Sequence, residues 1–261
     1  MMADVLGDRD IAGRDWRLAR ISCRVEGHLA QQPRDLVKLP GIHITYDTSQ
    51  VIDKRSWKED VRMPRDRDVQ AFDDRAASYE SGRHGQLHKE ISDRAVRLAL
   101  SQVPAPRRVL DVGCGTGYVL RQLAARLPGA SEFLGVDPAP KMIEAARAAS
   151  SDERLNFTQG IAERLPADES VYDLVVSTTS FDHWTDQAAG IRECARALAP
   201  GGTLVLTDQF SSLLWPTMLG SRRGKARTRS RAGRLITAAG LRDPQWHPCY
   251  AVIIRSVTAV K

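Results

Sequence analysis

The chain has 261 residues and a mass of 28.9 kDa, with 42% hydrophobic residues, 27% charged residues and a formal net charge of +6. This length suits one large α/β domain with a buried core and argues against two full domains. Because no apolar run approaches the roughly twenty residues that span a bilayer, and no basic and apolar secretory signal opens the sequence, we expect a cytoplasmic protein.

The first 62 residues differ from the rest of the sequence. Charges of both signs alternate, apolar periodicity is poor, and Pro33 and Pro40 interrupt any long element. We therefore predict a poorly structured N-terminal extension or arm at residues 1–62 and a folded domain at residues 63–261. Two interpretations of the first segment stay open: translation naturally starts at Met63, or the segment is a lid or dimerisation arm.

From residue 70 the pattern alternates between helix and strand, which predicts a parallel sheet with helices on both faces. Right-handed crossovers bring the carboxyl ends of the first, second and fourth strands to one crevice, so residues after those strands should share a site. We predict helices at about 86–101 and 231–239, strands at 108–112, 132–136, 154–158, 172–177 and 203–208, and two closing strands within 241–261.

The stretch RRVLDVGCGTGYVLRQLAARL at residues 107–127 joins an apolar strand to a helix through a glycine-rich turn. Glycines let backbone N–H groups approach a ligand closely at the start of a helix, which is typical of nucleotide-type cofactor sites. The spacing G-x-G-x-G differs from the G-x-G-x-x-G of dinucleotide sites. Asp111, two residues before Gly113, suits a ligand with an ammonium group and would repel a diphosphate.

Three further stretches follow in the sequence. FLGVDPAPKMIEAARAA at 133–149 ends the second strand at Asp137, where a carboxylate can hold a ribose diol. FTQGIAERLPADESVYDLVVSTTSFDHWTD at 157–186 and CARALAPGGTLVLTD at 194–208 contain the fourth and fifth strands. Together, and in this order, the four stretches resemble the class I S-adenosylmethionine-dependent methyltransferases, a broad group that includes quinone and natural-product methylating enzymes.

The resemblance implies an α/β fold: a Rossmann-like, doubly wound sheet of seven strands, with the last strand antiparallel and helices on both faces. It also implies S-adenosyl-L-methionine as the cofactor. Relatives often carry an aspartate at the position of Ile161, so adenine recognition here would depend on the backbone around Ala162, on Glu163 and on apolar packing. The implied cofactor-binding residues are Tyr79, Asp111, Gly113, Cys114, Gly115, Gly117, Asp137, Pro138, Met142, Ala162, Glu163, Ser177 and Thr178.

Methyl transfer needs alignment of the reactants and, for many acceptors, removal of a proton. His183 lies in the loop after the fourth strand, and histidine is a common general base at neutral pH, so we predict His183 as the base, with Asp182 orienting it or acting instead. A purely structural role for His183 stays open. Tyr79 and Trp184 are the aromatic residues expected to border the cofactor, where a ring face can attract the positively charged sulfur.

The insertion at about 209–230 starts apolar and ends in the basic run 221–234, and we predict that it caps the substrate side of the crevice. We expect a small-molecule acceptor. A nucleic-acid (RNA) methyltransferase and a noncatalytic S-adenosylmethionine-binding module are the alternatives, and the oligomeric state is open. No metal is expected, because the four cysteines are widely spaced and form no C-x-x-C pair.

Overall fold

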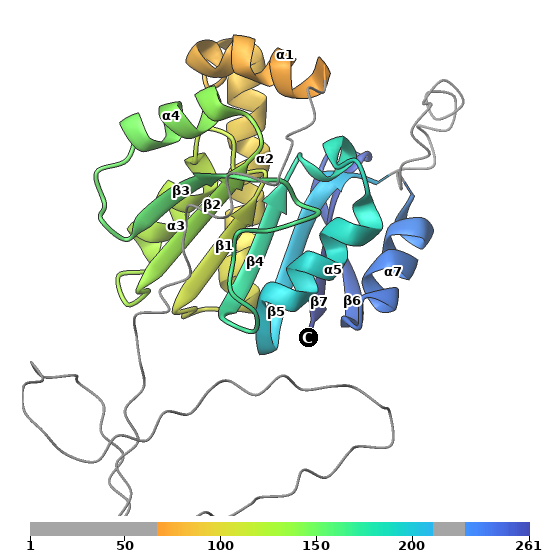
Figure 1. Ribbon diagram of the computed structural model, residues 1–261. Coiled ribbons are helices and arrows are strands. Elements are labelled where there is room, and N and C mark those ends of the chain that lie inside the picture. Colours follow the sequence, from red (N-terminus) through yellow and green to blue (C-terminus); the bar gives the residue numbers. More distant parts are fainter. Residues whose placement is uncertain (1–66, 211–227) are drawn as a thin grey trace, which may run out of the picture. The chain divides into compact units, whose positions relative to one another are not determined.

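The computed structural model describes residues 67–210 and 228–261. The predicted extension at 1–62 and most of the cap predicted at 209–230 lie outside these residues. Within the described part, the chain forms one seven-stranded sheet with the strand order β3-β2-β1-β4-β5-β7-β6 (Figure 1). The strands are β1 (Arg108–Val112), β2 (Glu132–Asp137), β3 (Leu155–Gln159), β4 (Tyr172–Thr178), β5 (Leu198–Gln209), β6 (Arg242–Tyr250) and β7 (Ile254–Val260).

The last strand, β7, pairs antiparallel with both β5 and β6, whereas β1 to β5 pair in parallel. This is the doubly wound sheet of seven strands that the sequence predicts. The helical segments are α1 (Arg67–Arg75), η2 (Ala76–Ser78), α2 (Gly82–Gln102), α3 (Tyr118–Arg126), α4 (Pro140–Ala148), η3 (Phe181–His183), α5 (Gln187–Ala197) and α7 (Arg229–Ala238).

Two hydrophobic cores lie on the two faces of the sheet, because side chains alternate along each strand. Val109 and Leu174 point into the core shared with α2, α3 and α4, whereas Leu110 and Val175 point into the core shared with α5 and α7. All four side chains are fully buried. Burial of each such side chain contributes roughly 1.5–3 kcal/mol, so the two cores fix the strands that carry the site.

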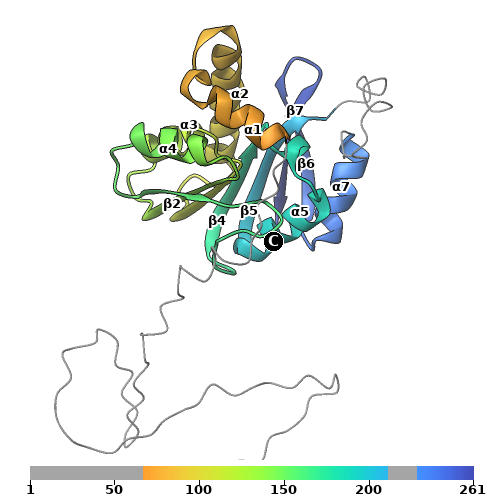
Figure 2. The ribbon, with the colours of Figure 1, turned by 45° about the horizontal axis from the view of Figure 1, so that its top comes forward.

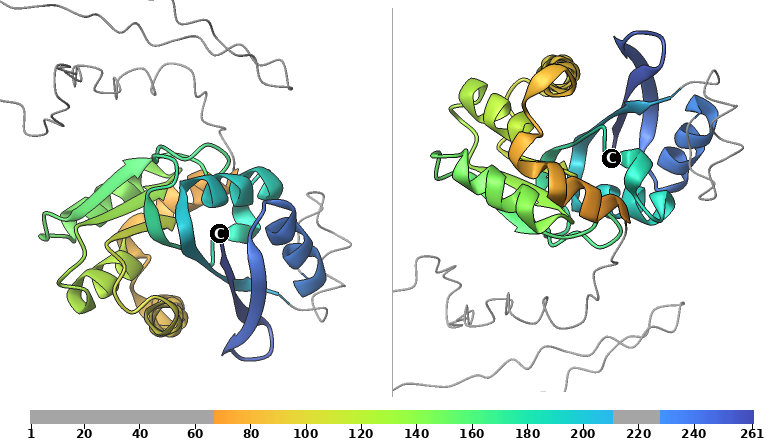
Figure 3. Two further views of the ribbon diagram at one scale, coloured as in Figure 1. Left: turned by 90° about the horizontal axis from the view of Figure 1, so that it is seen from below. Right: turned by 90° about the horizontal axis from the view of Figure 1, so that it is seen from above.

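Helix α1 lies across the edge of the sheet at which the parallel strands end. Figure 3 shows this arrangement from above, and in Figure 2, where that edge comes forward, α1 lies over it next to α4. Val69, Phe72 and Tyr79 pack with Met142 of α4, which attaches this covering segment to the domain. A helix at residues 67–75 therefore covers the ends of the parallel strands.

The start of β5 differs from the prediction, since the strand begins at Leu198 rather than at residue 203. Gly201 has a φ of +79°, and its N–H donates to the carbonyl oxygen of Lys261 at 3.1 Å. The turn sequence APGG is thus included in the sheet as an irregularity opposite Tyr172 and Leu174 of β4. Local turn propensity predicted a break here, and pairing with the neighbouring strands overrides it.

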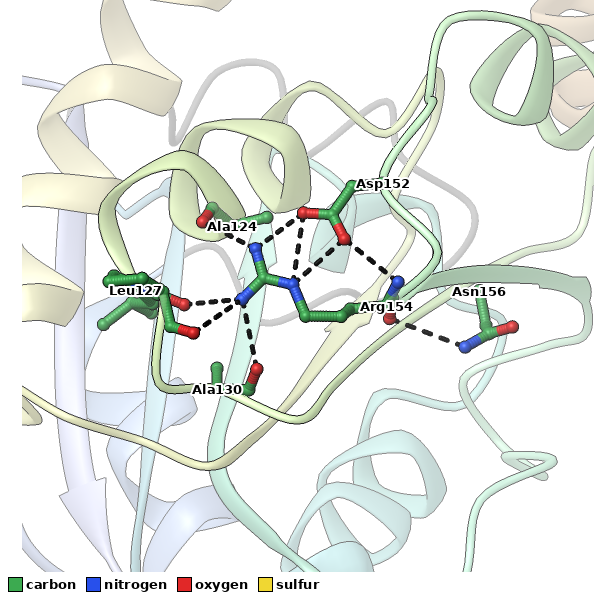
Figure 4. Close-up of polar contacts among 7 residues, drawn as sticks. Ala124, Leu127, Ala130, Asp152, Arg154 and Asn156 are labelled. Atoms are coloured by element: carbon green, nitrogen blue, oxygen red, sulfur yellow. Dashed lines mark hydrogen bonds and ion pairs between the residues drawn. The ribbon is translucent and has the colours of Figure 1, made fainter.

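A polar cluster that we call the Arg154 cap closes the opposite edge of the sheet (Figure 4). The Arg154 guanidinium donates to the carbonyl oxygens of Ala124, Leu127 and Ala130 and forms an ion pair with Asp152 at 2.6 Å. Hydrogen bonds from Arg154 lower the pKa of Asp152. These carbonyls belong to the last turn of α3 and to the turn that leads into β2, so the guanidinium connects both to the start of β3.

In the described ranges, no helix combines the length and apolar character needed to cross a lipid bilayer.

Candidate functional site

The glycine-rich turn between β1 and α3 is held against the end of β2. The N–H groups of Gly113 and Cys114 both donate to the carbonyl oxygen of Val136, at 2.8 and 3.1 Å. Gly113 has a φ of +78°, and a Cβ atom there would lie 2.3 Å from the side chain of Ser180. Only glycine allows this close approach between the turn and the loop after β4.

Asp111, in β1 and two residues before Gly113, is 1% exposed, and neither of its carboxylate oxygens has a hydrogen-bond partner in the described residues. Burial, and then the charge of Asp137, raise the pKa of Asp111 to about 8. A buried polar atom without a partner is costly, and nearly all such atoms in folded proteins have one. The carboxylate is therefore suited to a charged ligand group with N–H donors, such as an ammonium.

Asp137, at the end of β2, is 8% exposed, and both of its oxygens are fixed by backbone groups. One oxygen accepts from the N–H of Ala139 and the other from the N–H of Gly115, each at 2.9 Å. Burial raises the pKa of Asp137 to about 6, and these two hydrogen bonds oppose that rise. Each oxygen keeps a lone pair, so the carboxylate can accept two hydroxyl hydrogens of a diol.

Three adjoining cavities open at this edge of the sheet, and Tyr79 and Thr179 line all of them. Asp137 lines the first and Asp111 the second. The third, of about 390 Å³, combines apolar side chains with charged and polar ones, among them Arg75, His183 and Asp208. The sequence predicts one crevice, and in the described residues the structure shows adjoining cavities that share lining residues.

Most of the predicted cofactor residues lie in the walls of the first two cavities. The first cavity is lined by Tyr79, Gly113, Gly115, Asp137, Pro138, Met142, Ala162, Glu163 and Thr178, and the second adds Asp111 and Cys114.

Ser177 and Gly117 line none of the three cavities. The fully buried Ser177 hydroxyl forms a hydrogen bond with the Ser180 hydroxyl at 2.8 Å, because strand alternation turns Ser177 inward. Gly117 has a φ of +77° and approaches the ring of Phe157, so it serves backbone geometry and packing.

Ile161 lines the first cavity beside Ala162 and Glu163, so this end of the cavity is largely apolar. The Glu163 carboxylate accepts a hydrogen bond from the N–H of Asp186 at 2.9 Å, which ties the turn to the start of α5. The Ile161 side chain offers no hydrogen-bond acceptor here, whereas the second carboxylate oxygen of Glu163 accepts no hydrogen bond from the described residues and the residue lines the cavity.

His183, the predicted base, ends the short helix η3 and lines both the first and the third cavity. Its ring packs edge-on against Phe72 of α1, with the ring centroids 5.0 Å apart. Asp182 lines the third cavity only. His183 thus lines both the first cavity, which contains Asp137, and the third cavity. Trp184 also lines the first cavity, and its Nε1 donates to the Ser180 hydroxyl at 3.3 Å.

Glu80 connects the covering segment to the glycine-rich turn. Its carboxylate accepts from the Thr116 hydroxyl and from Arg121, both at 2.7 Å, and pairs with Lys89 at 3.3 Å. Burial raises the pKa of Glu80, but the hydrogen bonds from Thr116 and Arg121 outweigh it, so the pKa is lowered. This network holds the wall of the second cavity together.

Sequence reasoning missed several residues in these walls, namely Phe72, Glu80, Thr179, Ser180 and Asp208. Thr179 and Ser180 could have been found, since polar residues directly follow the fourth strand in the stretch STTS. Thr179 adopts a φ of +54°, which is rare for a β-branched residue and frequent at functional sites. Phe72 and Glu80 carry no local signal, because their positions depend on how the first helices cover the sheet.

Comparison with known proteins gives a consistent result. Residues 109–202 match a family model described as a methyltransferase domain. The chain is 39% identical over 134 residues to the demethylmenaquinone methyltransferase of Deinococcus radiodurans, which covers 48% of this chain and 55% of that protein. It is 30% identical over 213 residues to the malonyl-[acyl-carrier protein] O-methyltransferase of Geobacter sulfurreducens, which covers 73% of this chain and 78% of that protein.

Among solved structures, human N-acetylserotonin methyltransferase in complex with S-adenosylmethionine shares the fold. The TM-score is 0.55 with 19% identity, and the match covers 74% of this chain and 55% of that chain. The chain spans about half the length of the D. radiodurans relative, so its activity and acceptor are inferred from the site.

Proposed function

Because the chain belongs to the class I S-adenosylmethionine-dependent methyltransferases, we propose that it transfers a methyl group from S-adenosylmethionine to a small-molecule acceptor in the third cavity. The observation that carries this proposal is the pair of unpartnered, buried oxygens of Asp111 beside the glycine-rich turn. An ammonium group supplies the missing donors and positive charge, whereas a dinucleotide diphosphate would be repelled.

The residues present fit the parts of this cofactor. Asp111 holds the ammonium group in the second cavity, Asp137 holds the ribose diol in the first, and the turn beside Ile161 packs against the adenine. Bound S-adenosylmethionine supplies a methyl carbon activated by positively charged sulfur. The ring of Tyr79, which borders all three cavities, is available to face that charge.

The protein's task is then to align the acceptor with that carbon. Orientation of two reactants can lower a barrier by roughly 7 to 11 kcal/mol, so no covalent intermediate with the protein is needed. His183, on the boundary between the first and third cavities, accepts the proton that the acceptor atom loses. Asp182 lies next to it on the acceptor side.

The third cavity favours an acceptor with an apolar body. Phe72, Leu87, Ile91, Ile253 and Ile254 line it, and Arg75, His88, Asp182, His183 and Asp208 add charged or titratable groups. Its volume of about 390 Å³ falls within the range that small-molecule sites use.

Two measurements test this function. Calorimetry with S-adenosylhomocysteine should show binding to the wild-type protein, and a metabolite extract supplied with isotopically labelled S-adenosylmethionine should yield a labelled small molecule. Absence of cofactor binding would overturn the proposal. Label that appears only in nuclease-sensitive material would reject a small-molecule acceptor in favour of RNA.

We also propose a cytoplasmic location. Cys114, Cys194 and Cys249 are buried and carry no disulfide among the described residues, which supports a reducing compartment.

A further inference from the structure

Asp208 is a buried carboxylate that the cofactor does not use. It lies at the end of β5, is 3% exposed, and lines the third cavity together with Asp182 and His183. Burial raises the pKa of Asp208, and the hydrogen bond from the N–H of Gln209 opposes that rise. A carboxylate in this position needs a structural or chemical reason, because burying a charge is costly.

The first reason lies in the backbone. One Asp208 oxygen accepts from the N–H of Asp182 at 3.2 Å, and the other from the N–H of Gln209 at 2.6 Å. The N–H of Thr179 donates to the carbonyl oxygen of Thr207 at 2.8 Å. The loop that carries His183 is therefore attached to the end of β5 at two points, one of which is the Asp208 side chain.

The second reason is electrostatic. The charge of Asp182 raises the pKa of Asp208, and His183 lowers it, so the carboxylate and the imidazole interact through their charges. Proton uptake by His183 creates a positive charge beside a cofactor whose sulfur is already positive. Because like charges repel strongly in a poorly solvated site, this step requires a negative group close to the imidazole.

We propose that Asp208 is a positioning residue for His183: its carboxylate fixes the loop Phe181–His183 and provides the negative charge against which His183 takes up the acceptor's proton. This inference rests on the proposed function. The acceptor's bond to hydrogen breaks as its bond to the methyl carbon forms, the proton moves to a ring nitrogen of His183, and the electron pair of the carbon–sulfur bond stays on sulfur.

Other charged or titratable groups surround this pair, and each contributes to the field. Arg75 and Tyr79 come from the covering segment, His88 from α2 and Tyr250 from β6, and all four line the third cavity. Asp137 interacts with His183 from the first cavity, and Arg255 of β7 stands opposite Asp208 in the strand register. Asp208 lines the cavity and, from β5, accepts a hydrogen bond from the N–H of Asp182 in the loop that carries His183.

The direct test follows the Asp208 carboxyl by NMR in the full chain, with ¹³C-labelled aspartate carboxyls, and needs no acceptor. In His183→Ala the Asp208 titration should move to higher pH, because a favourable neighbour is lost, and in Asp182→Asn to lower pH, because a repelling charge is lost. His247→Ala is the matched control, since His247 bonds to Thr258 and lines none of the three cavities. An Asp208 titration that His183→Ala leaves unchanged would overturn the proposal.

A double-mutant cycle gives the kinetic test, using the labelled acceptor found in the metabolite extract. Asp208→Asn keeps the shape and one acceptor oxygen but removes the charge, so it should lower turnover about ten- to a hundredfold when His183 is present. In the His183→Ala background the same change should cost less than about twofold. Equal losses in both backgrounds would show a merely structural role and reject the proposal.

Calorimetry separates this proposal from the proposed function. Asp208→Asn should bind S-adenosylhomocysteine with the wild-type affinity, since Asp208 lines neither of the two cofactor cavities. If the wild-type protein itself fails to bind that ligand, the proposed function falls, while the Asp208 titration still decides whether the two side chains are coupled.

Discussion

The Arg154 cap and the carboxylate of Asp111 lie at opposite edges of the same sheet. The polar groups of the cap are hydrogen-bonded to one another, whereas the buried oxygens of Asp111 have no partner among the described residues. In the cap, the Arg154 guanidinium donates to four carbonyl oxygens and to Asp152. At the other edge, both Asp111 oxygens lack a partner within the described residues. A saturated cluster stabilises the fold, whereas an unsaturated one costs stability and marks where a ligand completes it.

Folding also shifts the pKa values of the two carboxylates, Asp152 and Asp111, in opposite directions. Hydrogen bonds lower the pKa of Asp152, so its charged form is stabilised by folding, whereas burial raises the pKa of Asp111 to about 8. Mutations in the Arg154 cap should therefore change the free energy of unfolding, whereas mutations at the edge with Asp111 should change ligand binding or turnover.

The largest effect is expected outside both clusters, at His183. His183→Ala should lower turnover about 10²- to 10⁴-fold, because the acceptor's proton loses its base, while the affinity for S-adenosylhomocysteine changes by less than about threefold. Initial rates with the labelled cofactor and calorimetry check the two halves of this statement. Wild-type turnover in the variant would rule out the role as base.

Asp111→Asn replaces the buried carboxylate at the cavity edge of the sheet with a neutral amide, which tests whether that edge binds the ligand. We expect a loss in S-adenosylhomocysteine affinity of about a hundredfold or more, since the partner of a buried ammonium is removed. Asp173→Asn is the control, because the Asp173 carboxylate accepts from the N–H groups of Arg107 and Arg108 and lines none of the cavities. Equal affinity in Asp111→Asn and wild type would contradict the assignment.

Without ligand, Asp111→Asn should have a higher free energy of unfolding than the wild type. The pKa of Asp111 is raised on folding, so its contribution to stability is fully present below about pH 4 and is lost as the pH rises towards 8. At pH 7 this loss is at most about 4 kcal/mol, and Asn cannot ionise. Urea unfolding at pH 5 and pH 8 should show a falling stability in the wild type and a flatter profile in Asp111→Asn. Parallel profiles would refute the raised pKa.

Arg154→Ala should show the reverse pattern. Loss of the donors to Ala124, Leu127 and Ala130 should lower the free energy of unfolding by about 1–2 kcal/mol, measured by urea titration. Ligand affinity should stay within about twofold. Arg126→Ala is the control, since that exposed side chain bonds only to Gln122 and should cost less than about 0.5 kcal/mol. A hundredfold loss of S-adenosylhomocysteine affinity in Arg154→Ala would contradict the assignment of a purely structural role to the Arg154 cap.

The smallest effect is expected for Glu80→Gln, which weakens the connection between the covering segment and the glycine-rich turn. The amide keeps an acceptor for Thr116 but loses the charge that pairs with Arg121 and Lys89. Because these pairs are partly exposed, we expect only about a three- to tenfold loss in S-adenosylhomocysteine affinity by calorimetry. A loss as large as that of Asp111→Asn would mean that Glu80 binds the ligand itself.

Residues that carry a local signal could be predicted from the sequence. The turn with Gly113, the acidic residue Asp137 after a buried strand, and the loop with His183 each combine a strand end with an unusual residue type, and all three line the first cavity. The sheet topology followed from the alternation of strands and helices. Local patterns are sufficient here because the fold brings strand ends together by a general rule.

Residues whose burial depends on distant segments could not be predicted. Asp208 resembles any polar residue at a strand end until β7 and the loop after β4 bury it, and Phe72 lines a cavity only because α1 crosses the sheet edge. Ser177, which the family resemblance implied as a cofactor residue, is fully buried, with its hydroxyl hydrogen-bonded to Ser180. For Asp208 and Phe72, tertiary packing decides whether the side chain reaches a cavity.

The proposed cofactor site depends on pairing between the buried Asp111 carboxylate and the ammonium group of S-adenosylmethionine. At pH 7 most of the Asp111 side chain is protonated in the free protein, since its pKa is about 8, and it must ionise to pair with that group. Calorimetry of S-adenosylhomocysteine binding in buffers of different ionisation enthalpy counts the protons that are exchanged. The wild type should release roughly one proton at pH 7 and Asp111→Asn none; the same proton exchange in both proteins would contradict the claim.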